Sequence, residues 1–504
     1  MSRPVIQLSG YAALIFITSA LVLVVEIVAA RLIAPFVGVS LYSWTAIIGV
    51  VLAGLSLGNW VGGVWADRGA TQRTAGVVLL FASLSVFSVL LILPQLAQHL
   101  QTVPLSLASL SLLLTGALFF VPAALLGVLT PLLITLSLQL SDRTGHIIGM
   151  LHALAALGSI LGTFVTGFWL VQWIGSRDII IATGIVLFVL SLPLLRKPAT
   201  IGAALMALLF GGLGLSLYGY ENPCDRESGY FCLRVVDASH EAPFGEARGL
   251  VLDHLLHGSN HREHPQLILA PYLHLIDELA AWQTGQDEGR SYFFAGGGAY
   301  TLPRALHDRD PKAHIVVAEI DPTVTKLAVD ELYVDTNPFE VRHTDARVAL
   351  QQDPAGKYDV IVGDVFHDIA IPYHLVTAEF SELVSQRLKP DGIYLMNVVD
   401  TYPNPLLVKA KMKTLASVFD DVQVWMDGPP DGQPRVTYVI SARNTGPELP
   451  FIYEAKRGLN RIWGQATQGL MAQGTAMAEV PLITDDLAPV ERLMTKLFLG
   501  DSAR

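Results

Sequence analysis

The stretch Ser291–Leu306 reads SYFFAGGGAYTLPRAL, and it decides the fold. Its apolar, aromatic start, Ser291–Ala295, predicts a buried strand, because short runs of this kind bounded by glycine are typical of buried strands. Gly296, Gly297 and Gly298 follow at once, and a helix-like pattern comes next. A strand, a glycine turn and a helix in this order are typical of a fold that brings a nucleotide close to the backbone.

Acidic residues end the strands that follow. The run His314–Ile320 (HIVVAEI) predicts a second strand ending at Glu319, and Tyr358–Asp364 (YDVIVGD) predicts a third. Strands that alternate with helices predict a parallel, doubly wound sheet, whose ligands bind at the carboxyl ends of the strands. We therefore expect Glu319 to take ribose hydroxyls. Further strands are expected at Ile393–Val398 and Val422–Trp425.

The glycine turn does not fit the dinucleotide pattern well, because the third position of G-x-G-x-x-G is missing. The acid series continues with Asp345, Ala346 and Arg347. An adenosine held through its ribose and adenine, without a pyrophosphate, fits these residues better. The residues therefore favour S-adenosylmethionine or a relative as the ligand, with no metal.

Residues 1–220 have the composition of a membrane domain. Only eleven charged residues lie between Tyr11 and Tyr218, although 15% of the whole chain is charged. The run 104–140 is too long for one span, and Pro122 and Pro131 can split it into two helices or kink one. Seven or eight spans through a lipid bilayer follow. The other spanning runs are 11–33, 43–66, 74–97, 146–173, 178–195 and 199–218.

Basic residues set the expected orientation. Arg68 and Arg73 predict a cytoplasmic loop, which puts the N-terminus inside. With eight spans the domain after the last span is also cytoplasmic, and with seven it is outside. We expect an integral protein of a bacterial inner membrane with a cytoplasmic catalytic domain. The expected domains are a transmembrane helical domain over 1–220 and a nucleotide-binding catalytic domain over 221–504.

Charged and small residues mark special positions within the spans. Glu26 and Arg31 lie in the first span, where charge is expensive, so we expect either a structural ion pair or a functional pocket. Gly54, Gly58 and Gly62 lie four apart on one helix face. This pattern predicts close helix packing.

Charge and cysteine content bound the remaining possibilities. The net charge of −11 divides into about +4 over 1–220 and about −15 over the rest, an acidic balance that argues against nucleic-acid binding. The only two cysteines, Cys224 and Cys232, do not make a metal site. A disulfide, which would indicate an oxidising compartment, and two free thiols are both compatible with the spacing.

Most of residues 221–400 resemble the spermidine synthase (polyamine aminopropyltransferase) family, in its membrane-fused branch. The resemblance implies a Rossmann-like transferase domain with a small β-hairpin region at about 225–260. It also implies a small-molecule donor, either S-adenosylmethionine or its decarboxylated form, release of 5′-methylthioadenosine, and a homo-oligomer. The motifs are ESGY from Glu227, LDHLLH from Leu252, Tyr272, AGGGA, AEIDP, TDAR, YDVIVGDVFHDIAIPYHLVTAEF and, in the tail, TDDLAPVE from Thr484.

The resemblance also implies roles for single residues. Glu319 would hold the ribose and Asp345 the adenine amino group. Asp364 would receive the proton of the acceptor. His257 stands where the family has a donor-contacting Gln, and Tyr272 where it has an active-site Tyr.

This chain departs from the family at the acids that hold a cationic diamine. Soluble members carry acids at the positions of Ala299, Ile268 and His274. Their Asp-x-x-Asp motif becomes Asp364 followed by His367, with Asp368 one step late. Losing these carboxylates should weaken polyamine binding. The catalytic candidates are then Asp364, His367, Asp368 and Tyr272.

The departure at Ala299 opens a second chemistry. Alanine leaves N–H groups at a helix start free to bind an anion, such as the carboxylate of intact S-adenosylmethionine. That carboxylate could attack its own γ-carbon and expel methylthioadenosine, leaving homoserine lactone, or water could attack instead. The alternatives are genuine spermidine synthesis from putrescine, and a transporter or sensor regulated by the bound nucleotide.

Overall fold

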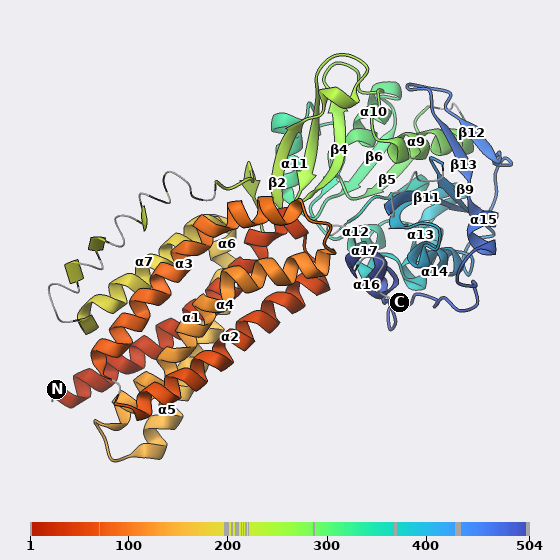
Figure 1. The fold of residues 1–504 in the computed structure, drawn as a ribbon. Coiled ribbons are helices and arrows are strands. Elements are labelled where there is room, and N and C mark those ends of the chain that lie inside the picture. The colour runs from red at the N-terminus through yellow and green to blue at the C-terminus, as the bar shows by residue number, and fades with distance from the viewer. Residues whose placement is uncertain are drawn as a thin grey trace. The chain divides into compact units, whose positions relative to one another are not determined.

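The computed structural model divides into two compact units, Met1–Cys232 and Leu233–Arg504, each of which is described by itself (Figure 1). The first unit thus extends past residue 220, to the second cysteine. The residues described are 3–69, 71–195, 201–202, 205–206, 211–212, 214, 216, 219, 221–285, 288–366, 370–428 and 435–499.

The first unit is a bundle of long apolar helices. Six of its described helices are long and apolar enough to cross a membrane. Most of the expected span 199–218 lies outside the described residues, so a seventh span stays a prediction. The elements are α1 Arg3–Val37, α2 Leu41–Asp67, α3 Gln72–Gln101, α4 Leu107–Leu138, α5 Thr144–Val165, the π-helix η1 Thr166–Leu170, α6 Val171–Trp173, α7 Ser176–Leu195 and the short strand β1 Arg226–Glu227.

The run 104–140 forms one helix, α4, and the alternative of two helices is wrong. Pro122 and Pro131 lie inside α4 without ending it. Prolines are tolerated in such helices because neighbouring helices and local adjustments satisfy the freed backbone groups. Pro122 is itself buried in the bundle.

The glycines of α2 confirm the predicted close packing. A Cβ added at Gly58 would lie 2.0 Å from the backbone oxygen of Ala124 in α4. One added at Gly62 would lie 2.5 Å from the oxygen of Val128. The two backbones approach each other so closely that only glycine fits between them.

The charged pair expected in the first span is not formed as predicted. The Arg31 guanidinium donates to the backbone carbonyls of Ser228, Tyr230 and Phe231, in place of the Glu26 carboxylate. These carbonyls belong to the segment that follows the helices. The sequence could not predict this because the acceptors are backbone atoms almost two hundred residues away.

The second unit joins a small antiparallel meander to a large sheet covered by helices. The strands of the large sheet follow the order β12-β13-β10-β11-β9-β8-β5-β6-β7. The meander is β2 Cys232–Asp237, β3 Ala247–Leu252 and β4 Leu255–His261, with the 3₁₀ turn η2 Ser239–Glu241. The large sheet is β5 Ser291–Ala295, β6 His314–Ala318, β7 Glu340–Arg342, β8 Tyr358–Gly363, β9 Leu388–Thr401, β10 Asp421–Met426, β11 Arg435–Arg443, β12 Ile452–Glu454 and β13 Ile462–Gln465. The helices are α9 Pro271–Thr284, α10 Thr301–Arg309, α11 Pro322–Glu331, α12 Ala346–Gln351, η3 Tyr373–Leu375, α13 Ala378–Arg387, α14 Leu406–Leu415, α15 Thr467–Ala472, α16 Val490–Leu493 and α17 Thr495–Leu499.

The sheet is mixed, which corrects the expectation of an all-parallel sheet. Strands β7, β6, β5, β8 and β9 pair in parallel, but β11 pairs with β9 and β10 in antiparallel fashion. Only eight residues join the end of β10 to the start of β11, which is too few for the crossover that parallel neighbours need. The parallel half carries the predicted motifs.

The parallel strands bring the expected site residues to one edge. Ala295 at the end of β5 pairs with Ala318 of β6 on one side and with Gly363 of β8 on the other. The residues that follow these three strand ends therefore meet at the same edge of the sheet.

We predict that Gly58→Ala destabilises the bundle by about 1–3 kcal/mol, because the added methyl group overlaps the α4 backbone. Gly63→Ala in the same helix is the matched control, since a Cβ there meets nothing within 4 Å. Thermal unfolding in detergent measures both. Equal melting temperatures for the two variants would contradict the packing described for α2 and α4.

Candidate active site at the glycine turn

The glycine turn after β5 is held against the end of β8. Gly296 has a φ of +91°, and a Cβ there would lie 2.3 Å from the carbonyl oxygen of Asp364. The Asp364 amide donates to the Ala295 carbonyl at 3.0 Å, and the Gly296 amide donates to Ala318 at 2.9 Å. Tyr300, with a φ of +56°, then leads into α10. The position of Gly296 thus excludes any side chain and allows close backbone approach.

Glu319 closes the turn from the neighbouring strand. One carboxylate oxygen accepts from the Gly297 amide at 2.9 Å and from the Gly298 amide at 3.4 Å. The other accepts from the Asp321 amide at 2.9 Å. Burial raises the pKa of Glu319, while these backbone donors lower it. Glu319 therefore already binds the N–H groups of two of the three turn glycines.

Asp345 lies at the start of α12, where its side chain caps the helix. Its carboxylate accepts from the amides of Arg347 at 2.9 Å and Val348 at 3.1 Å. Its other oxygen lies 2.7 Å from Nε2 of His374. Ala346, beside it, is buried. The carboxylate is fixed in orientation by both contacts.

The tail motif reaches this helix. Arg347 makes a two-pronged ion pair with Asp485, with both nitrogen–oxygen distances at 2.7 Å. The Ala378 amide, at the start of α13, donates to the Ile483 carbonyl. This bond joins the residue before the tail motif to α13. The tail thus supports the loop that carries Asp345.

Asp364 has a strongly perturbed carboxyl group. Burial raises its pKa to about 7, although hydrogen bonds from Asn397 and Tyr272 lower it. Part of its surface remains accessible, so a ligand can reach a carboxyl group that the surrounding protein holds in an apolar setting. A carboxyl group that exchanges its proton near pH 7 is suited to general acid–base work. Burial and the Asp364 charge together raise the pKa of Tyr272 well above its ordinary value.

Asn397 is a site residue that the sequence did not reveal. It lies in β9, next to β8, and is 3% exposed. Its side chain bonds to Asp364, and its Oδ1 has no partner among the described residues. No motif signals it, because an asparagine inside an apolar strand has no characteristic spacing. His374 and Asp485 were missed as partners for the same reason, although both lie within quoted motifs.

His257 stands beside the glycine turn, on β4. Its carbonyl oxygen would lie 3.2 Å from a Cβ at Gly298, so the strand runs along the turn. Burial lowers the pKa of His257 to about 4, helped by the nearby charges of His254 and Arg435. Its Nε2 is buried without a partner among the described atoms. The imidazole is therefore neutral at pH 7.

The three residues that replace family acids are all buried in the packed interior. Ala299 is 2% exposed and packs on Gly258. A Cβ added at Gly258 would lie only 2.9 Å from the Cβ of Ala299. Ile268 is buried in the core. His274 is also buried and contacts the Arg457 carbonyl through Nε2 at 2.8 Å. None of the three presents an acid.

The predicted residues fall into three groups. The glycines, Glu319, Asp364 and Tyr272 come together through direct contacts, and His257 lies against the turn. Asp345 lies after the next parallel strand, β7, bonded to His374. The catalytic candidates His367 and Asp368 lie outside the described residues.

A glycine turn after one parallel strand, with acids following its two neighbours, is the arrangement of a Rossmann-like fold. Two curated bacterial proteins are similar in sequence. One is a probable polyamine aminopropyl transferase of Bifidobacterium longum, 27% identical over 41% of this chain and 49% of the relative. The other is a polyamine aminopropyltransferase of Vibrio vulnificus, 35% identical over 25% of this chain and 42% of the relative. Over the matched parts the chain is therefore similar to polyamine aminopropyltransferases, which supports a spermidine synthase-like family.

The matches cover only parts of the proteins compared. The chain spans less than half the length of either curated relative. No family model matches it. Among solved structures, a probable spermidine synthase from Corynebacterium glutamicum is 20% identical, with a TM-score of 0.43, over 52% of this chain and 95% of that one. A spermidine synthase bound to the transition-state analogue AdoDATO is 18% identical, with a TM-score of 0.32, over 42% and 75% of the two chains.

The raised pKa of Asp364 predicts a pH-dependent stability cost. The carboxyl group has a pKa of about 7 when folded and an ordinary, lower value when unfolded, so the folded state binds the proton more tightly. Stability is then lost as pH rises towards 7 and is constant above it. Asp364→Asn should therefore stabilise the protein, by an amount that grows from pH 5 to pH 7.

Thermal unfolding at several pH values measures this gain. Asp420→Asn, at an exposed aspartate, is the control and should show no such trend. A gain from Asp364→Asn that does not change with pH would contradict the buried setting of the carboxyl group.

Proposed function

We propose that this chain is a membrane-integrated enzyme of a bacterial inner membrane. It binds S-adenosylmethionine or the decarboxylated form and releases 5′-methylthioadenosine. The observation that carries the proposal is Asp364, a reachable carboxyl group of pKa about 7 at the strand end next to the glycine turn. The similarity to polyamine aminopropyltransferases supports a transferase.

The donor's adenosine would lie along the glycine turn, where the absence of side chains lets it approach the backbone. Glu319 and Asp345 stand at the two next strand ends for the ribose and the adenine amino group. Oε2 of Glu319 already accepts two backbone hydrogen bonds, but Oε1 accepts only one and keeps a lone pair for a hydroxyl.

The reaction requires little beyond positioning and one proton transfer. A nucleophile attacks the carbon next to the sulfonium, the carbon–sulfur bond breaks, and its electron pair neutralises the sulfur of the leaving methylthioadenosine. When water or a protic acceptor is the nucleophile, its proton passes to ionised Asp364. Attack by the donor's own carboxylate releases no proton. Tyr272 and Asn397 hold that carboxylate in place, and alignment of the reacting atoms supplies the rest.

The charges near the site disfavour a diamine. A polyamine is held by carboxylates at both ends, yet Ala299, Ile268 and His274 offer none and are packed away from solvent. Arg435 adds a positive charge near His257. These features support intact S-adenosylmethionine as the donor, with transfer to another acceptor or lyase-type cleavage. Spermidine synthesis from putrescine is the second candidate, supported by the relatives' names.

Methylthioadenosine release separates the candidates. Purified full-length protein is incubated with S-adenosylmethionine alone, and separately with the decarboxylated form plus putrescine. We expect methylthioadenosine from the first mixture, and Asp364→Asn should lower turnover at least 100-fold while nucleotide binding is retained, within the usual range for a general base. Asp420→Asn is the matched control.

The other outcomes are equally informative. Product from the second mixture alone would establish spermidine synthesis instead. Tight binding without product from either mixture would overturn the enzyme proposal in favour of a nucleotide-regulated transporter or sensor.

We further predict a shifted pH profile for Tyr272→Phe. The hydrogen bond from Tyr272 lowers the pKa of Asp364, so its loss should move the acidic limb of the turnover profile to higher pH. Tyr373→Phe is the control, because Tyr373 is 63% exposed. An unchanged acidic limb in Tyr272→Phe would show that Asp364 is not the group that titrates in turnover.

A further inference from the structure

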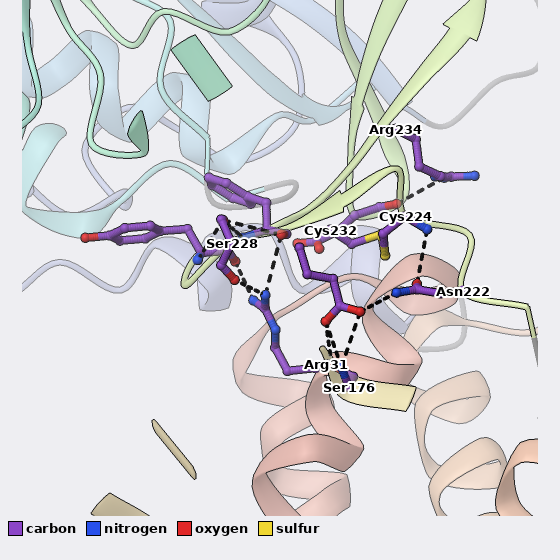
Figure 2. Close-up of a disulfide and its surroundings, with 11 residues drawn as sticks. Arg31, Ser176, Asn222, Cys224, Ser228, Cys232 and Arg234 are labelled. Atoms are coloured by element: carbon purple, nitrogen blue, oxygen red, sulfur yellow. Dashed lines mark hydrogen bonds between the residues drawn. A yellow bond between two sulfur atoms is a disulfide. The ribbon is translucent and has the colours of Figure 1, made fainter. Parts of the chain in front are cut away.

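The segment 221–232 is bound to one end of the helical bundle (Figure 2). At the end of α1, the Arg31 guanidinium donates to the carbonyls of Tyr230 at 2.8 Å, Phe231 at 3.4 Å and also Ser228. Arginine at this depth is stabilised when carbonyl oxygens replace its hydration. One end of the segment is thereby fixed beside the last turns of α1.

The same segment also caps the start of α7. The Glu227 carboxylate accepts from the Ser176 amide at 3.1 Å and from the Ser176 hydroxyl at 2.7 Å, and Asn222 donates to it as well. A carboxylate at a helix N-terminus is favourable because the unpaired amides there carry partial positive charge. Residues 222–231 therefore lie at the level where α1 ends and α7 begins.

Residue 222 and the end of α7 lie at opposite ends of that helix. Helix α7 has 20 residues and ends at Leu195, about 30 Å from Ser176 at ~1.5 Å per residue. The Glu227 carboxylate is bonded to Ser176, at the start of the same helix. The two ends of the connection between 195 and 222 therefore lie about one membrane span apart.

The sequence of that connection suits a crossing. Residues 199–218 contain no charged side chain, and those of them that the structure describes are helical. Twenty apolar residues match the thickness of a bilayer core. The six long helices and the run 199–218 then make seven spans, because 104–140 forms one helix. An odd number of spans puts the N-terminus and residue 222 on opposite sides of the membrane.

Basic residues identify the side of the N-terminus. Of the eight Lys and Arg residues in 1–220, six flank the helix ends on that side, and only Arg31 and Arg177 lie towards the other. Short loops rich in Lys and Arg stay in the cytoplasm. The six are Arg3, Arg68, Arg73, Arg143, Arg196 and Lys197.

The two cysteines give an independent indication. Cys224 and Cys232 form a disulfide within the same segment. Disulfides persist in oxidising compartments and are rare in the cytoplasm of mesophiles. Both cysteines lie on the side opposite the basic loops.

We propose that the chain leaves the bundle at Cys232 on the extracytoplasmic side, so that the spermidine synthase-like domain lies outside the cytoplasm. This inference rests on the membrane integration proposed above, and not on the reaction. It replaces the cytoplasmic placement expected from the sequence, which required 104–140 to supply two spans. A donor made in the cytoplasm then has to cross the membrane to reach the glycine turn.

Cysteine labelling in intact bacterial cells tests the orientation. In a Cys224→Ser/Cys232→Ser background, Lys326→Cys reports on the exposed surface of α11, and Thr144→Cys reports on the exposed start of α5. A membrane-impermeant maleimide should label Lys326→Cys in intact cells and Thr144→Cys only after permeabilisation. The reverse pattern would overturn the proposal.

The unmodified chain provides the second measurement, in case the serine variants fold poorly. After acid trapping of thiols in cells, Cys224 and Cys232 should react with maleimide only after reduction. Reaction without reduction would also overturn the proposal. Extraction of the protein from membranes by alkaline carbonate would refute membrane integration itself. Failure of the proposed orientation would show in the labelling, and failure of the proposed reaction would show in the methylthioadenosine assay.

Discussion

The candidate site depends on the contact between Gly296 and Asp364. No side chain fits where the α-carbon of Gly296 meets the Asp364 carbonyl, and the backbone bonds beside it join three strand ends. This contact places an open backbone surface next to a carboxyl group. Any larger residue at position 296 would separate the two, so the proposed nucleotide approach and the proposed proton transfer depend on the same spacing.

The electrostatics of the site follow from burial. The environment that raises the pKa of Asp364 to about 7 also keeps His257 neutral, with a pKa of about 4. Burying a carboxyl group costs stability when it is ionised, and active sites commonly accept that cost to obtain a suitable pKa. Glu319 contributes differently, since its carboxylate already stabilises the turn that approaches the ligand.

Patterns with a fixed spacing could be predicted from the sequence. The glycine turn, Glu319 and Asp364 follow apolar strands, so their placement at one edge needed only the rule for parallel strands. Contacts that depend on tertiary packing could not. Asn397 reaches Asp364 from the middle of β9, and Asp485 binds Arg347 from 138 residues away.

The helical unit shows the same division. The glycine spacing predicted the packing of α2 on α4, because small residues at this period act locally. The partner of Arg31 is a set of backbone carbonyls, which no side-chain pattern encodes. The disulfide likewise could not be decided from two cysteines eight residues apart.

The most direct test of a sulfonium-nucleoside site is the binding of 5′-methylthioadenosine, measured by calorimetry on the purified full-length protein. The account predicts saturable binding at one site per chain, weakened about 10-fold or more in Glu319→Gln, since a lost charge-assisted hydrogen bond is worth about 1.5–3 kcal/mol. Absence of binding to the unmodified protein would contradict it.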